Sequence, residues 1–175
     1  MKSEATQNTG HSIFQKLLNH ARNMRVDFNL VLARYGVERV LYRLSQSNYS
    51  EKFILKGASL FLIWMGKSYR VTRDADFLGS GPADPEHLAE VFRDVINILP
   101  TVNDGLIFDP NSINAVPIRE DQVYDGVRVT FTGLLHTARI PVQIDVGFGD
   151  SVVPAPELVE FPSILGQPAA QLQAY

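Results

Sequence analysis

The chain has 175 residues, of which 45% are hydrophobic, so it can bury one sizeable core but has little room for a second full domain. Its formal net charge of -3 argues against a protein that coats nucleic acid or an anionic membrane through bulk positive charge, and any polyanion must be bound locally. The sequence contains no cysteine, which excludes disulfides and thiolate metal sites and agrees with the cytoplasm, where we expect the protein.

The N-terminal part is predicted to be a tail followed by two helices. Residues 1–11 are polar, contain no apolar signal segment and are expected to form a disordered tail. The second helix should begin at the N-cap candidate Asp27 and end near Ser45. The first helix is predicted from one stripe of apolar residues at helical spacing: Phe14, Leu17, Leu18 and Ala21.

The next segment is predicted to run strand, small-residue turn, helix, strand. A short apolar strand over residues 53–55 leads into the turn Lys56-Gly57-Ala58-Ser59, and the apolar run Leu60–Met65 is expected to form a buried helix. This run is too short to span a bilayer, so we expect no membrane association. Residues 70–78 alternate well enough to form the second strand.

The clearest helix is predicted over residues 85–99, with Asp84 as N-cap and Pro85 at the first helical position. Its apolar stripe is Leu88, Val91, Phe92, Val95 and Leu99. Two strands with alternating apolar residues follow, near 127–132 and 139–146, and a hairpin around residues 133–137 joins them. This order predicts an α+β (mixed α/β) fold with N-terminal helices packed on a small mixed sheet.

The character of the sequence changes after Asp150. Little periodicity remains, and prolines recur at Pro154, Pro156, Pro162 and Pro168. We therefore predict that residues 12–153 form the catalytic domain and that residues 154–175 are a proline-rich linker to a further part of the protein.

Three aspartates are the candidates for chemistry. Asp74 and Asp76 are two positions apart on a predicted strand, so both side chains leave the same face. Asp145 ends a later strand on its polar face. On a strand beside the first pair, Asp145 would complete a three-carboxylate site, and oxygen ligands without Cys or His favour Mg2+ or Mn2+. The alternative for each aspartate is a solvated strand position.

Basic and small residues near these aspartates are candidates for binding phosphate. The Gly57–Ser59 turn opens a helix, where backbone N–H groups and the helix dipole attract anions. Arg70 shares the predicted face of Asp74, and Lys56 precedes the turn, so both are candidate phosphate ligands. The alternatives are an ordinary strand-to-helix turn and cations that merely balance the carboxylates.

Three motifs together resemble the AbiEii abortive-infection toxin family: Lys56-Gly57-Ala58-Ser59, the run from Arg70 to Phe77, and Ile144-Asp145-Val146-Gly147-Phe148-Gly149-Asp150. Residues 32–45 also resemble the N-terminal helical region of that family, and the similarity covers about residues 10–175. The resemblance implies a polymerase-beta-like nucleotidyltransferase fold. It also implies transfer of a nucleotide from a nucleoside triphosphate with Mg2+ to an acceptor, which in relatives can be the 3′ end of tRNA.

The family pattern also carries site roles onto this chain. It implies triphosphate binding at Gly57 and Ser59, metal binding at Asp74 and Asp76, and further carboxylates at Asp145 and Asp150. A type IV toxin–antitoxin role with a separately encoded antitoxin protein is implied as well. Family members continue into a helical half with a D-x-x-K motif, which does not occur in this sequence. We therefore expect this chain to be the N-terminal catalytic half.

Two rival interpretations remain beside the transferase. A truncated, non-catalytic module that docks an antitoxin or a partner domain would keep the fold and lose metal-dependent nucleotide binding. A metal-dependent nuclease would use the same carboxylates, but it would have no use for the Gly57–Ser59 turn.

Overall fold

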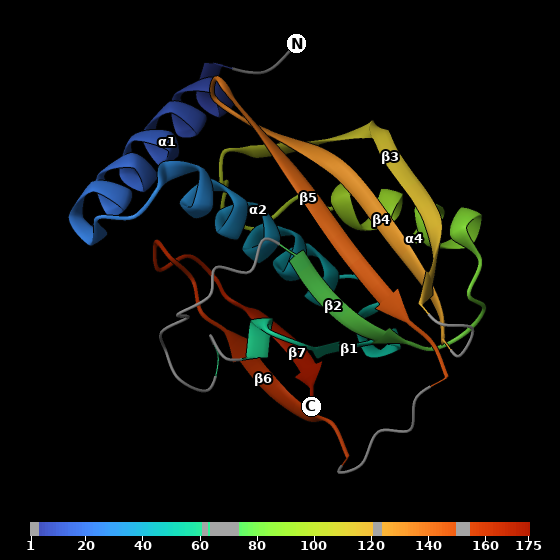
Figure 1. Cartoon of the computed structure of the whole chain (residues 1–175). Helices are drawn as coiled ribbons and strands as arrows, with labels where there is room; N and C mark the ends of the chain where they lie inside the picture. Colours follow the sequence, from blue (N-terminus) through green and yellow to red (C-terminus); the bar gives the residue numbers. More distant parts are fainter. Residues whose placement is uncertain (1–3, 61–62, 64–73, 121–123, 150–154) are drawn as a thin grey trace.

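A mixed seven-stranded sheet forms the centre of the molecule. The computed structural model describes residues 4–60, 63, 74–120, 124–149 and 155–175. Within them the strand order is β3-β4-β5-β2-β1-β7-β6 (Figure 1). The pairs β5/β2 and β1/β7 are parallel and the other neighbouring pairs are antiparallel. The strands are β1 (Phe53–Lys56), β2 (Asp74–Gly79), β3 (Leu106–Glu120), β4 (Tyr124–Leu135), β5 (Ala138–Gly147), β6 (Glu157–Phe161) and β7 (Ala170–Ala174).

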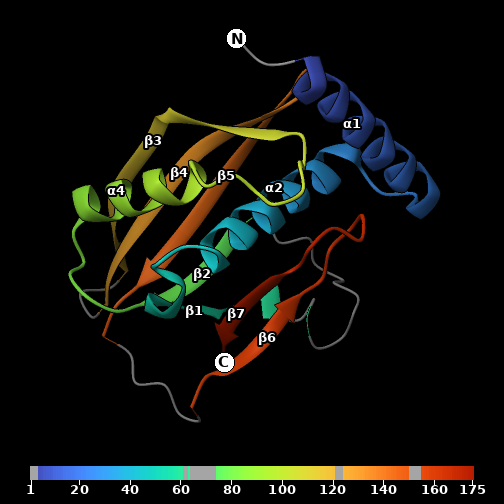
Figure 2. The same ribbon diagram turned by 180° about the vertical axis from the view of Figure 1, so that it is seen from behind.

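Helices cover one face of this sheet. They are α1 (Glu4–Met24), α2 (Phe28–Ser45) and α4 (Pro85–Ile96). Figure 2 shows α2 and α4 lying across the sheet, with α1 beyond the first turns of α2. Asp27 caps α2 by accepting from the backbone N–H of Asn29, and Asp84 caps α4 through the N–H of Glu86, as the sequence predicts. The predicted α+β fold is therefore confirmed.

The core lies between the sheet and these helices. Phe53 packs against Phe77 and Phe92 with ring centroids 5.8 Å and 5.5 Å away, so β1, β2 and α4 meet there. Helix α2 approaches β5 closely at Gly36, where an added Cβ would lie 2.8 Å from Cγ2 of Ile140. This close contact explains a glycine inside the helix, despite its low helix propensity. None of α1, α2 and α4 lies on the opposite face of the sheet.

A buried ionic network fastens two loops to α2. Asp104, 1% exposed, accepts hydrogen bonds from Arg39 Nε at 2.9 Å and from Arg43 at 2.8 Å. The neighbouring Glu38, also 1% exposed, accepts a hydrogen bond from the backbone N–H of Ile164 at 2.6 Å. Because buried charges need partners, these bonds fix the loops before β3 and before β7.

Two predictions about the ends of the chain are wrong. Residues 4–11 belong to α1 and are not a disordered tail. The segment predicted as a linker contains β6 and β7, and β7 lies inside the sheet between β1 and β6. Its signal was the alternation of Ala170, Leu172 and Ala174, all buried, with two glutamines. Burial of this small apolar face against α2 outweighs the effect of the prolines before it.

Two further details differ from the sequence prediction. Leu99 was expected in the core stripe of α4, but the helix ends at Ile96 and Leu99 is 89% exposed. The following Pro100 disfavours helical geometry at Leu99. Strand β3 was not predicted, because Pro110 and Pro117 interrupt it. Prolines are tolerated there because β3 is an edge strand with an irregular register.

Candidate active site

Strand β2 places two aspartates on the sheet face opposite α2 and α4, which we call the open face. Ala75 and Phe77 are fully buried against the core, whereas Asp74 and Asp76 alternate with them and are partly exposed. Because side chains alternate across a strand, both aspartates point to the open face. The predicted geometry of this pair is confirmed.

Asp145 lies directly beside Asp76. Strands β2 and β5 are parallel neighbours, and their register pairs Asp76 with Asp145. The register continues to both sides, since Lys56 on β1 pairs with Asp76 and Arg128 on β4 pairs with Asp145. A row of four charged residues therefore crosses four strands in the order Lys56, Asp76, Asp145, Arg128. We call it the charged row.

Burial and two neighbouring negative charges disfavour the ionised form of Asp76. The pKa of Asp76 is raised first by burial and then by the negative charges of Asp145 and Asp74. Lys56 and Arg128 act in the opposite direction. A bound cation between the carboxylates would relieve this repulsion, so the oxygen donors suit a hard divalent ion such as Mg2+.

Arg128 is a site residue that the sequence prediction missed. Its Nε and Nη2 donate to the two carboxylate oxygens of Asp145 at 2.9 Å and 3.0 Å. Both oxygens of Asp145 therefore face Arg128. Among the described residues, no three His, Cys, Asp or Glu side chains are grouped closely enough to hold one ion. The sequence did contain a signal for Arg128. This residue alternates with the apolar Val127 and Val129 and therefore lies on the polar face of its strand.

The turn after β1 packs closely against Asp76 of the charged row. Gly57 has a φ of +77°, and an added Cβ would lie 2.6 Å from Oδ2 of Asp76. Only glycine fits this position, for both backbone and steric reasons. Ser59 is 3% exposed, and its hydroxyl donates to the backbone carbonyl of Asp74 at 3.4 Å. The side chain of Ser59 thus ties the turn to β2, and the backbone of the turn borders the carboxylates.

The other predicted phosphate ligands divide into two groups. Lys56 extends over β5, because a Cβ added at Gly147 would lie 3.3 Å from its Nζ. Arg70 and Asp150 lie outside the described residues. Of the predicted site residues, the structure thus brings together Lys56, Gly57, Ser59, Asp74, Asp76 and Asp145.

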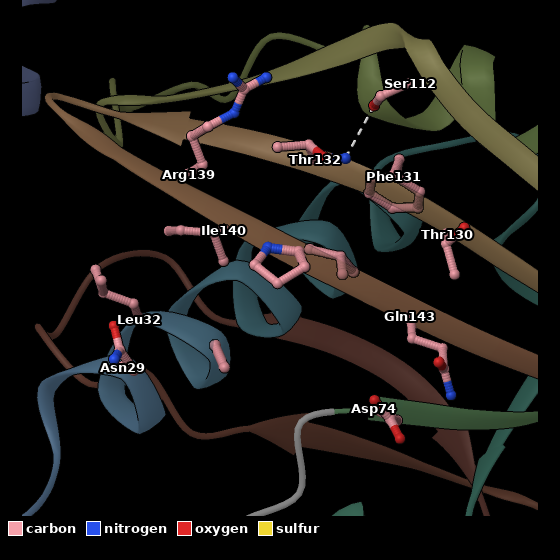
Figure 3. A pocket seen from close by; sticks show the side chains of 13 residues that line it. Asn29, Leu32, Asp74, Ser112, Thr130, Phe131, Thr132, Arg139, Ile140 and Gln143 are labelled. Carbon is pink, nitrogen blue, oxygen red and sulfur yellow. Dashed lines mark hydrogen bonds between the residues drawn. The ribbon is translucent and has the colours of Figure 1, made fainter.

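A groove with a volume of about 580 Å3 begins at Asp74 and extends along β4 and β5. Figure 3 shows Gln143 beside Asp74 at one end of the groove, Thr130 on the next strand, and Arg139 at the far end. Its other wall comes from the first turns of α2, where Leu32 contributes. No helix in the described part of the chain is long and apolar enough to cross a membrane.

Comparison with known proteins gives one match. The model of the family described as "Nucleotidyl transferase AbiEii toxin, Type IV TA system" matches residues 39–175. The matched region begins within α2 and includes every described residue of the charged row and of the Gly57–Ser59 turn. No curated protein and no solved structure matches the chain.

Proposed function

Because the chain belongs to the AbiEii family of nucleotidyl transferase toxins, we propose that it transfers a nucleotide from a nucleoside triphosphate to an acceptor hydroxyl, with Mg2+ bound by Asp74, Asp76 and Asp145. The acceptor oxygen would form a bond to the α-phosphorus. The bond from that phosphorus to the β-phosphate oxygen would break, pyrophosphate would leave with the electron pair, and the hydroxyl proton would pass to solvent.

The observation that carries this proposal is the pairing of Asp76 with Asp145 on parallel strands, beside Asp74. The three carboxylates share one open sheet face, and the pKa of Asp76 is raised first by burial and then by the negative charges of Asp145 and Asp74. When bound there, Mg2+ would neutralise charge on the phosphoryl oxygens and activate the acceptor hydroxyl. Asp145 would have to share or give up one hydrogen bond to Arg128 in order to contribute.

The other residues of the site bind and orient the triphosphate in this proposal. The backbone N–H groups of the Gly57–Ser59 turn would receive phosphate oxygens, and Lys56 would supply a positive charge near them. We assign Arg70 to nucleotide binding because it shares the predicted strand face of Asp74, and Asp150 because of the family pattern. The turn would contact the phosphates through its backbone N–H groups, because the hydroxyl of Ser59 is directed at β2.

The acceptor and the partner are proposed from the family. A cognate antitoxin protein fits the type IV toxin–antitoxin description. An RNA acceptor, such as the 3′ end of tRNA, is carried over from the family resemblance. We place this reaction in the cytoplasm, where both RNA and nucleoside triphosphates are available.

The test is a labelling assay with Asp74→Asn. The protein should transfer label from a radiolabelled nucleoside triphosphate to RNA when Mg2+ is present, and Asp74→Asn should reduce transfer about a hundred- to a thousandfold, as for loss of a transition-state charge contact. Asp94→Asn is the matched control, since Asp94 lies on α4, on the other side of the sheet. Unchanged labelling by Asp74→Asn would contradict the assigned site.

Titration calorimetry separates the transferase from a docking module. A transferase should bind nucleoside triphosphate with Mg2+ and lose this binding in the presence of a chelator. A module that only docks an antitoxin would bind no nucleotide in either condition, and that result would overturn the proposed function.

A further inference from the structure

We propose that the groove along β4 and β5 binds the acceptor, and that it takes the terminal nucleotides of a single-stranded RNA 3′ end. This inference rests on the proposed transfer reaction and deepens it. It assigns the β1 side of the carboxylate site to the nucleoside triphosphate and the β4 and β5 side to the acceptor.

The groove and the glycine turn flank the carboxylate site on opposite sides. The Gly57–Ser59 turn lies on the β1 side of Asp76, and the groove lies on the β4 and β5 side. In an in-line phosphoryl displacement the attacking oxygen and the leaving group stand on opposite sides of the phosphorus. If the turn receives the phosphates that leave, the attacking hydroxyl must come from the side of the groove.

The second step is the register along the groove. Thr130 on β4, Gln143 on β5 and Asp74 on β2 are cross-strand neighbours on the open face. They form a polar row next to the charged row, and a hydroxyl bound there lies beside the carboxylates. The carboxamide N–H of Gln143 donates weakly to Asp145 at 3.5 Å, which directs its amide toward the same aspartates.

The third step is the charge at the far end of the groove. Arg139 lies on the same strand face as Gln143, four residues earlier, or about 13 Å along β5. It is exposed and makes no hydrogen bond or ion pair with any residue in the described ranges. The groove therefore has a polar row beside the carboxylates at one end and an exposed guanidinium at the other. This arrangement matches an RNA 3′ end, which has neutral hydroxyls at the terminus and phosphodiesters farther back.

The walls and the size of the groove agree with a nucleotide occupant. Its volume of about 580 Å3 lies within the usual range of sites for small organic groups. Pro141, which is exposed, supplies apolar surface for a base or ribose, while Thr130 and Thr132 supply hydroxyl groups. A protein acceptor would present a hydroxyl without an anion at a fixed distance, and it would leave Arg139 without a function.

The experiment compares Arg139→Gln with Arg93→Gln. Both substitutions remove one exposed arginine charge, but Arg93 lies on α4, on the helix-covered side of the sheet. In the labelling assay, Arg139→Gln should raise the KM for RNA about tenfold, as expected for loss of one charged hydrogen bond, and should leave the KM for the nucleoside triphosphate unchanged. Arg93→Gln should change neither.

Direct binding gives a second readout that needs no turnover. Fluorescence anisotropy with a short single-stranded RNA, in chelator and without nucleotide, should show weaker binding by Arg139→Gln than by Arg93→Gln. The difference should shrink at high salt, because the lost contact is to a phosphate. Equal RNA affinity and equal KM in the two variants would overturn the groove assignment while the transferase reaction stands.

The proposed function fails in a different way. If the unsubstituted protein transfers label to no acceptor, the transfer reaction itself is wrong. If it labels a protein and no RNA, the transfer reaction stands and the RNA occupant of the groove is wrong.

Discussion

Arg128 holds Asp145 by both carboxylate oxygens, at 2.9 Å and 3.0 Å. A planar guanidinium matches a carboxylate in this two-bond geometry, and the pair is therefore well oriented although the side chain of Arg128 is 43% exposed. Arg128 thus occupies the oxygens that a metal ion would need. In the proposed site, a metal ion and Arg128 would compete for this carboxylate, and the outcome would decide whether Asp145 faces β4 or the aspartates of β2.

Replacing Arg128 should make the protein depend more strongly on divalent cations. In Arg128→Gln, Asp145 and Asp76 lose a nearby positive charge, so the unfolding free energy without metal should fall by about 1 kcal/mol or less, the scale of a partly exposed ion pair. Added Mg2+ should then raise the Tm of Arg128→Gln more than it raises the Tm of the unsubstituted protein. Thermal unfolding with and without Mg2+ measures both effects.

Arg93→Gln serves as the control for this prediction, because it removes an arginine from α4 and should leave the Mg2+ response unchanged. Arg128→Lys should behave between the two, since an ammonium keeps the charge but lacks the fork. An identical Mg2+-induced shift of Tm in Arg128→Gln and Arg93→Gln would show that Arg128 does not compete with the metal.

Gly57→Ala should disturb the carboxylates as well as the backbone. Its φ of +77° costs an alanine about 1–2 kcal/mol, and the added methyl group would also meet the side chain of Asp76. Asp76 must therefore rotate away. We expect the Mg2+ affinity to fall by about tenfold, as for loss of an orienting contact beside a metal ligand.

The matched variant is Gly81→Ala. Gly81 also has a positive φ, +101°, but an added Cβ would have no neighbour within 4 Å. This variant should show the backbone cost alone, with normal Mg2+ affinity. Urea unfolding and Mg2+ titration of both variants separate the two effects, and equal Mg2+ affinities would refute the contact between Gly57 and Asp76.

Glu38 should make stability fall as the pH rises. Burial raises the pKa of Glu38 from its usual value near 4.5 to about 7, against the opposing effects of the Ile164 N–H, Arg39 and Arg34. The folded protein therefore keeps a proton that the unfolded chain loses between about pH 4.5 and 7. In that window the unfolding free energy should decrease with pH, by up to about 3 kcal/mol in total.

Glu38→Gln should remove this component, because the amide does not titrate and its carbonyl oxygen can still accept from Ile164. Urea unfolding between pH 5 and 8 compares it with Glu90→Gln, which changes an exposed residue of α4. The pH dependence should flatten in Glu38→Gln alone. Parallel pH curves for both variants would mean that Glu38 is ionised throughout in the folded protein.

Local patterns in the sequence were enough to predict much of the site. Alternation along a strand put Asp74 and Asp76 on one face and set Asp145 opposite its apolar neighbours, and both features are present in the structure. The caps of α2 and α4 were also predictable, because an aspartate before a helix satisfies free N–H groups within the same few residues. Each of these signals depends only on neighbours in the chain.

Strand pairing was decided by the tertiary structure alone. The sequence by itself established three carboxylates on polar strand faces and a glycine turn. It could not establish that Asp76 pairs with Asp145, or that Arg128 donates two hydrogen bonds to Asp145. Nor could it place β7 between β1 and β6. Register between strands distant in the chain depends on how the whole sheet buries its apolar face, and no local periodicity encodes that choice.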